Sequence, residues 1–210
     1  MTPTFVLVPG AGGQAWYWHR VVPELERRGF PAVAVDLPAD DDTAGLAVYA
    51  DAVVAAAGDA ADVVLVAQSM GGLTAPLVCD RLPVRLLVLL NAMVPRPGET
   101  GGDWWAATGH DVDASDDAFV HDVPAEVLAT APPPRDQSGR PFEDPWPLPA
   151  WPDVRTVVLA GRDDRFFPPD FQRRVAAERL GLEVGEVPGG HCAALARPVE
   201  LADRLVSLVG

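Results

Sequence analysis

Short apolar runs alternate with longer segments of helical periodicity along most of the chain. The runs are rich in Val and Leu, and their apolar residues fill consecutive positions rather than every second one. Strands of a parallel sheet show this pattern because both of their faces are buried. The expected strands occupy residues 5–8, 32–35, 63–66, 86–90, 157–159 and 182–187.

Segments of helical length separate these runs. The expected helices occupy residues 16–28, 45–57, 73–81, 170–180 and 199–208. Alternation of strands and helices predicts an α/β fold, with a mostly parallel sheet of about six strands and helices on both faces. In such a sheet the functional site lies at the carboxyl ends of the strands.

Residues 95–152 break the alternation, because no convincing strand occurs there. Their first part contains short helical pieces, and residues 132–152 are dense in proline and aromatic residues. A long insert of this kind is usually functional or disordered. Its tryptophans favour order, since they need a surface to pack on. We therefore expect a core of residues 1–94 and 153–210 and a small lid of residues 95–152 over the strand ends, with a flexible linker as the alternative.

Composition and charge narrow the classes of function. The formal net charge of −14 disfavours nucleic acid and anionic membranes as partners, because both attract positive surfaces. All 16 basic residues are arginine, so a pyridoxal phosphate Schiff base and a P-loop lysine are excluded. Two cysteines and four scattered histidines provide neither a disulfide framework nor a metal-binding pattern. We expect no metal and no cofactor.

The first residues, MTPTFVLVPG, lack a basic leader, and their apolar run is too short for a signal peptide or a spanning helix. We expect a soluble, cytoplasmic protein. A homodimer that forms through the lid or a sheet edge stays open, because no apolar face stands out in the sequence.

A serine follows the third apolar run, in the sequence VVLVAQSMGGL of residues 63–73. Ser69 and the glycines after it predict a nucleophile elbow, the sharp strand-to-helix turn of the pattern G-x-S-x-G. Such a turn holds the hydroxyl at the top of the sheet in a strained backbone geometry. Ala67 replaces the first glycine of the pattern, and alanine is the smallest available substitute. The alternative is an ordinary turn in which Ser69 caps a helix.

A serine hydroxyl is a weak nucleophile and needs a general base that a third group orients. The elbow predicts an acid and then a histidine further along the chain. Asp163 and Asp164 follow a strand in VVLAGRDDRFFP, and His191 lies in the glycine-rich loop GGHCAAL. His191 is the one histidine after the elbow and outside residues 95–152. This ordered set favours serine-based acyl transfer.

The whole pattern resembles a serine hydrolase of the α/β-hydrolase fold. The opening FVLVPGAGGQAWYWHRVVPELERRGF is similar to that of the plant methylesterase and hydroxynitrile lyase group and its bacterial relatives, which read H-G-A-x-x-G-A-W-x-W after the first strand. Pro9-Gly10-Ala11 stands in the place of H-G-A, and Ala15-Trp16-Tyr17-Trp18 in the place of A-W-x-W. The resemblance covers nearly the whole chain and is weakest over residues 95–152.

The resemblance implies roles for individual residues. Ser69 is the nucleophile and His191 the base. Gly161, Asp164 and Pro168 fit the acid loop G-x-x-D-x-x-x-P, so Asp164 is the expected orienting acid and Asp163 the alternative.

The oxyanion of the reaction needs backbone donors. The N–H of Met70, directly after the nucleophile, is one expected donor, and by resemblance the N–H of Ala11 is the second. The glycines around Ala11 allow close approach of the backbone. The same glycine-rich run lacks the dinucleotide spacing G-x-G-x-x-G, which disfavours a phosphate site.

Aromatic residues of the expected lid are candidates for an apolar substrate pocket. They are Trp104, Trp105, Phe142 and Trp146. Packing between lid and core explains them equally well. His110 and His121 also lie in this segment and are assigned to the surface rather than to the substrate. Cys192 is expected to be a packed side chain, because no base orients its thiol.

The favoured activity is cofactor-free hydrolysis of a small, hydrophobic carboxylic ester, thioester or lactone through an acyl-enzyme. One alternative is a lyase of the hydroxynitrile type. The resemblance implies that those lyases use a lysine in the lid and a threonine near the first loop, whereas this chain has no lysine and carries Gly10 at the threonine position. The other alternative is a relative that binds a small ligand without turning it over.

Overall fold

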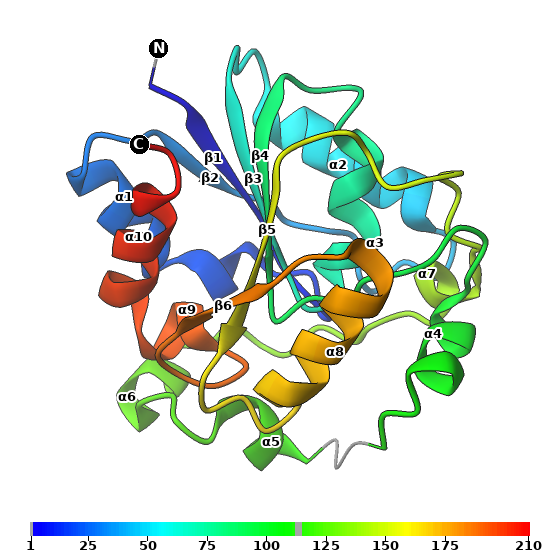
Figure 1. The fold of residues 1–210 in the computed structure, drawn as a ribbon. Coiled ribbons are helices and arrows are strands. Elements are labelled where there is room, and N and C mark those ends of the chain that lie inside the picture. Colours follow the sequence, from blue (N-terminus) through cyan, green and yellow to red (C-terminus); the bar gives the residue numbers. More distant parts are fainter. Residues whose placement is uncertain (1, 112–114) are drawn as a thin grey trace.

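Six strands pair in parallel, in the order β2-β1-β3-β4-β5-β6, in the computed structural model, which describes residues 2–111 and 115–210 (Figure 1). They are β1 (Thr4–Val8), β2 (Ala32–Ala34), β3 (Val63–Gln68), β4 (Val84–Leu90), β5 (Thr156–Gly161) and β6 (Val184–Val187). The predicted parallel α/β sheet is confirmed. From β1 the chain adds β2 on one side, and it then crosses over to add β3 and the later strands on the other side of β1. Open α/β sheets bind ligands at the carboxyl ends of the two strands that flank such a reversal, here β1 and β3.

Successive residues of the central strands point into two separate cores. Val64 and Val66 of β3 pack under α1 (Val21–Arg27) and α10 (Pro198–Ser207), on one face of the sheet. Leu65 of β3 packs on the other face, under α2 (Leu46–Ala57) and α8 (Pro169–Leu180). Figure 1 shows the sheet nearly edge-on between these two helical layers. Burial on both faces explains why the strands read as continuous apolar runs.

Two of the expected helices are interrupted, and proline explains both interruptions. The expected helix 16–28 consists of the 3-10 turn η1 (Ala15–Trp18) followed by α1, because Pro23 lacks an N–H and fits only in a first turn. The expected helix 73–81 consists of α3 (Gly71–Thr74) and the 3-10 turn η2 (Ala75–Val78), with Pro76 at the break.

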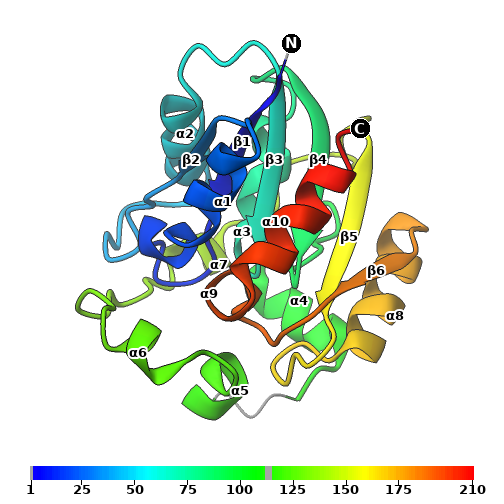
Figure 2. The ribbon, with the colours of Figure 1, turned by 90° about the vertical axis from the view of Figure 1, so that its left-hand side faces the viewer.

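Residues 95–152 contain short helices and, in their described part, no strand. The helices are α4 (Gly101–Thr108), α5 (Asp116–Val120), α6 (Ala125–Leu128) and α7 (Arg140–Glu143). In both views α5 and α6 lie at the end of the molecule opposite the two chain termini (Figures 1 and 2). A last short helix, α9 (Ala193–Ala196), begins two residues after His191, with Cys192 at its N-cap.

The proline-rich residues 132–152 are bound to the core by specific hydrogen bonds. The indole of Trp146 is 2% exposed and donates to the carbonyl of Leu73 over 3.0 Å. The carboxylate of Asp144 accepts from the N–H of Leu46 at 3.0 Å and so caps α2, whose own N-cap residue is a glycine. This segment is therefore a packed part of the structure rather than a free linker.

Candidate active site

Ser69 occupies the turn between β3 and α3 with a left-handed backbone. Its φ of 52° is rare for a residue other than glycine, and such strain is concentrated at functional sites. The turn is tight, since a side chain at Gly72 would overlap the carbonyl oxygen of Met93. The strand end, the strained serine and the close helix together form the elbow geometry that the sequence predicts.

Three side chains from separate loops meet at this turn in one chain of hydrogen bonds. The Ser69 hydroxyl lies 3.0 Å from Nε2 of His191, and Nδ1 of His191 lies 2.9 Å from Oδ2 of Asp164. The carboxylate can only accept, so Nδ1 carries the ring proton and Nε2 is free to accept from the hydroxyl. Ser69 is 8%, His191 2% and Asp164 3% exposed, so bulk water does not compete with these bonds.

Backbone groups fix the orientation of Asp164. Its second carboxylate oxygen accepts from the N–H groups of Phe166 and Phe167, both at 2.8 Å. Asp163, the alternative acid, is exposed, and its carboxylate faces the N–H of Gly189 at 3.4 Å. The structure thus brings Asp164, and not Asp163, against the imidazole.

The loop after β1 passes close to the elbow. A side chain at Gly10 would come within 2.8 Å of the Ser69 Cβ, so only glycine allows this approach. Of the expected oxyanion donors, Met70 directly follows Ser69 in the chain and Ala11 lines the same cavity as Ser69, and no hydrogen bond from either N–H is found among the described residues. The N–H of Gly12, in contrast, donates to Oε1 of Gln137 at 3.0 Å.

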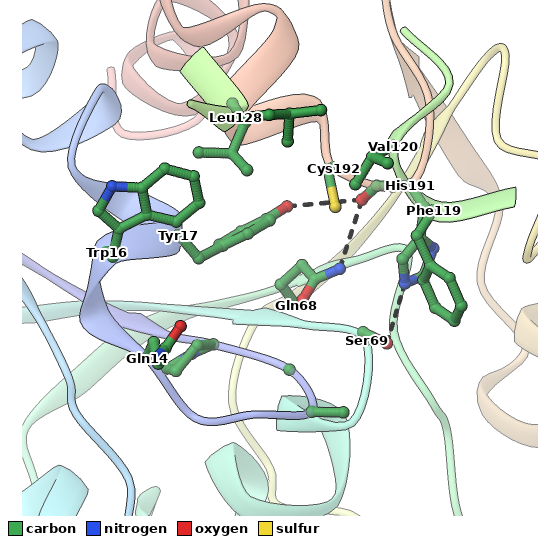
Figure 3. A pocket seen from close by; sticks show the side chains of 14 residues that line it. Gln14, Trp16, Tyr17, Gln68, Ser69, Phe119, Val120, Leu128, His191 and Cys192 are labelled. Carbon is green, nitrogen blue, oxygen red and sulfur yellow. Dashed lines mark hydrogen bonds between the residues drawn. The ribbon is translucent and has the colours of Figure 1, made fainter. Parts of the chain in front are cut away.

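A cavity of about 230 Å³ opens beside the Ser69 hydroxyl. In Figure 3, Ser69 and His191 lie on one side of it and Trp16 on the opposite side. Its walls are mainly apolar, and no arginine or carboxylate side chain belongs to the lining formed by the described residues. The lining consists of Pro9, Gly10, Ala11, Gln14, Trp16, Tyr17, Gln68, Ser69, Phe119, Val120, Leu128, His191, Cys192 and Leu195.

The four aromatic residues expected in the pocket do not line this cavity, which corrects their placement. Trp104 is fully buried, and its indole donates to the Val94 carbonyl at 3.1 Å. Trp105 packs edge-on against Trp104, Trp146 is buried in the same core, and Phe142 covers Gly101. All four rings pack within the fold, and the indole N–H groups of Trp104 and Trp146 also reach backbone carbonyls, so these rings anchor the segment to which they belong.

Other aromatic side chains form the cavity wall. Trp16 and Tyr17 belong to η1 directly after the first loop, and Phe119 belongs to α5. The match to A-W-x-W could have identified Trp16 and Tyr17 as cavity residues, because this motif directly follows the expected oxyanion loop. The sequence of α5 carried no comparable signal.

The remaining candidate residues are His110, His121 and Cys192. His110 lies 2.6 Å from the Phe166 carbonyl and stacks on Phe171, and His121 lies 3.9 Å from the Asp122 carboxylate; neither lines the cavity. Cys192 does line it, but burial and the nearby Asp164 raise the pKa of its thiol to about 12. The thiol therefore stays protonated at neutral pH and is a poor nucleophile.

Burial also raises the pKa of the Tyr17 phenol well above its ordinary value, so the phenol remains neutral.

Over the described ranges, no three His, Cys, Asp or Glu side chains are grouped to hold a metal ion. Within the same ranges no helix has both the length and the apolar character needed to cross a bilayer.

Comparison with known proteins gives this geometry a context. Residues 5–204 match the profile of the alpha/beta hydrolase family. "Probable esterase PIR7A" of Oryza sativa subsp. indica is 39% identical over 111 residues, covering 47% of this chain and 42% of that protein. Methylesterase 7 of Arabidopsis thaliana is 36% identical over 104 residues, covering 43% of this chain and 40% of that protein. The chain thus spans about two fifths of the length of the curated relatives it matches.

The solved structure of a pyrethroid hydrolase from Sphingobium faniae JZ-2 resembles this one over 99% of this chain and 97% of the other, with a TM-score of 0.79. The two sequences are 22% identical, so this likeness shows the shared fold.

Proposed function

Because the chain belongs to the alpha/beta hydrolase family, we propose that it is a cofactor-free serine hydrolase that cleaves a small, uncharged carboxylic ester, thioester or lactone through an acyl-enzyme. The observation that carries the proposal is the hydrogen-bonded chain from Ser69 through His191 to Asp164, which ends at an apolar cavity. The names of the relatives, an esterase and a methylesterase, support ester hydrolysis.

In this mechanism the Ser69 hydroxyl attacks the ester carbonyl while Nε2 of His191 takes its proton. The Asp164 carboxylate holds the imidazole in the correct tautomer and stabilises its protonated form. The N–H groups of Ala11 and Met70 receive the negative charge that develops on the carbonyl oxygen. Each such donor contributes about 3–4 kcal/mol to the stability of the transition state. His191 then protonates the leaving alcohol, and a water molecule repeats the cycle on the acyl-enzyme.

The cavity supports a small and uncharged substrate. Its volume of about 230 Å³ is below the range of pockets that hold drug-sized ligands, about 300–1,000 Å³. Among the described residues, the cavity lining contains no arginine that could bind a carboxylate group of the substrate and no carboxylate that could bind an amine. The net charge of −14 also disfavours the approach of anionic esters.

Residues 95–152 act as a lid in this proposal, through the part of the segment that reaches the cavity. Phe119 and Val120 of α5 and Leu128 of α6 form one wall opposite the first loop. They shield the reacting carbonyl from bulk water, which strengthens the polar interactions within the site.

The test is intact-mass analysis after treatment with a fluorophosphonate. We expect one adduct on the wild-type protein and none on Ser69→Ala, whereas the surface control Ser207→Ala reacts like wild type. With 4-nitrophenyl acetate as substrate, Ser69→Ala lowers kcat by on the order of 10⁶, as for other serine nucleophiles. An adduct that persists in Ser69→Ala, or a folded wild-type protein that does not react, contradicts the mechanism and favours a ligand-binding role.

A further inference from the structure

Asn91 is a fully buried polar residue that is bonded to both the acid loop and the histidine loop of the candidate active site. It follows directly after β4, at the end of an apolar run, and is 0% exposed. It is also one of two residues other than glycine in the described chain with a positive φ, 47°, and the other is Ser69. A buried, strained polar side chain persists only when its surroundings hold it in place.

The carboxamide of Asn91 is saturated with hydrogen bonds. Its Nδ2 donates to the carbonyls of His191 at 3.0 Å and Gly190 at 3.2 Å. Its Oδ1 accepts from the N–H of Gly161 at 2.6 Å and from Nε2 of Gln172 at 3.2 Å. These partners fix the orientation of the amide, since an N–H must face the oxygen and carbonyls must face the nitrogen. An amide has two donors and two acceptor sites, and all four are used.

Two of these partners belong to the loops that carry the acid and the base of the proposed triad. Gly161 begins the acid turn, in which its carbonyl accepts from the N–H of Asp164 at 3.1 Å. The bond from Nδ2 to the His191 carbonyl holds the base itself. The backbone carbonyl of Leu90, the residue before Asn91, accepts from the N–H of Ser69 at 3.2 Å. The Asn91 side chain therefore joins the acid loop to the histidine loop, and the backbone beside it is bonded to the nucleophile.

The His191 carbonyl has a further donor in Nε2 of Gln68, at 3.3 Å. Gln68 is the last residue of β3 and directly precedes the nucleophile. Asn91 differs from Gln68 in that it does not line the cavity, and its effect on substrate binding is therefore indirect.

We propose that Asn91 is a positioning residue that sets the place of the His191 imidazole between Ser69 and Asp164. The proposal rests on the proposed serine hydrolase function. A hydrolase of this kind depends on geometry at the level of a fraction of an ångström, and a misplacement of about 1 Å costs about 100-fold in rate. Asn91 touches no reacting atom, so its removal lowers the rate of the acylation step without altering the pocket.

The test uses Asn91→Asp, which keeps the size and both acceptor contacts but removes the two N–H donors that face the His191 and Gly190 carbonyls. With 4-nitrophenyl acetate we expect kcat to fall about 100-fold with little change in KM. The second-order rate constant for reaction of Ser69 with the fluorophosphonate falls by the same factor. The far-downfield proton resonance of His191 Nδ1–H shifts or disappears in the folded variant.

Asn91→Gly provides a second variant, because glycine adopts a φ of 47° without strain and introduces no buried charge. The matched control is Leu89→Ala, two residues earlier on β4, whose side chain is fully buried in the core and does not line the cavity. This control lowers the unfolding temperature but leaves the rate constants of the folded protein unchanged.

Wild-type rates in folded Asn91→Asp or Asn91→Gly would overturn the proposal, as would losses no larger than those of Leu89→Ala. These results are distinct from failure of the hydrolase function, in which the wild-type protein itself forms no adduct.

Discussion

Two neighbouring regions of the same connection relate to the candidate active site in opposite ways. In residues 115–131, α5 and α6 place Phe119, Val120 and Leu128 on the cavity wall. Residues 132–152 contribute nothing to the described cavity lining, yet they are bound closely to the core and to the loop after β1. One region lines the cavity, and the other supports the loop after β1.

The difference shows that aromatic content does not identify a substrate pocket. Three of the four tryptophans of residues 95–152 donate their indole N–H to a backbone carbonyl: Trp104 to Val94, Trp146 to Leu73 and Trp151 to Pro95. An indole held in this way anchors a segment that lacks regular structure. The part of the cavity wall that α5 and α6 provide consists of Phe119, Val120 and Leu128, whose side chains carry no polar atom that needs a partner.

The largest expected effect concerns the anchoring region. Trp146→Ala removes a ring that is 2% exposed and should lower the free energy of unfolding by about 3–5 kcal/mol. Urea denaturation followed by circular dichroism measures this loss. The KM of the protein that remains folded should not change, and a raised KM would show that residues 132–152 also shape the cavity.

A smaller effect is expected on the cavity wall. Phe119→Ala removes a half-buried ring that lies 5.5 Å from the His191 ring, and we expect KM for an apolar ester to rise about tenfold, or about 1.4 kcal/mol. The matched control is Phe142→Ala, another half-buried phenylalanine, which lies in residues 132–152 and outside the cavity. Equal changes in KM for the two variants would remove the distinction between the regions.

The smallest effect tests how the supporting region reaches the chemistry. Gln137 accepts from the N–H of Gly12 at 3.0 Å and donates to the Tyr49 hydroxyl at 3.1 Å. Gln137→Ala removes this hold on the loop that carries Ala11, so kcat should fall about fivefold, or about 1 kcal/mol, with KM unchanged. Steady-state kinetics beside Asp136→Ala, an exposed neighbour, measures the effect. Identical kcat values for the two variants would contradict a role in supporting the oxyanion loop.

The sequence predicts the sheet well because its signals are local. The central strands β1, β3 and β4 are short apolar runs, and burial on both faces leaves little room for another interpretation, whereas the edge strand β6 contains a glycine and an exposed glutamate. The elbow is equally local, since Ser69 and its glycines are adjacent in the chain. Prolines broke two expected helices, and this was visible in the sequence because Pro23 and Pro76 lie inside the expected ranges.

The cavity wall and the support of the loops depend on contacts between distant residues. Gly12 and Gln137 are 125 positions apart, and no periodicity links them. Asn91 stands out in the sequence as a polar residue at the end of an apolar run, but its four partners come from three other segments. Patterns along a chain report which residues are buried, and they do not report which segments meet.

The bond between Gly12 and Gln137 has a consequence for how this scaffold can be re-engineered. Exchange of the entire β4–β5 connection for that of a relative would remove the support of the loop after β1 together with the α5–α6 wall of the cavity. A graft with junctions near residues 115 and 131 would replace the α5–α6 wall and retain the support. The boundary of the exchangeable module therefore lies inside the connection, not at its ends.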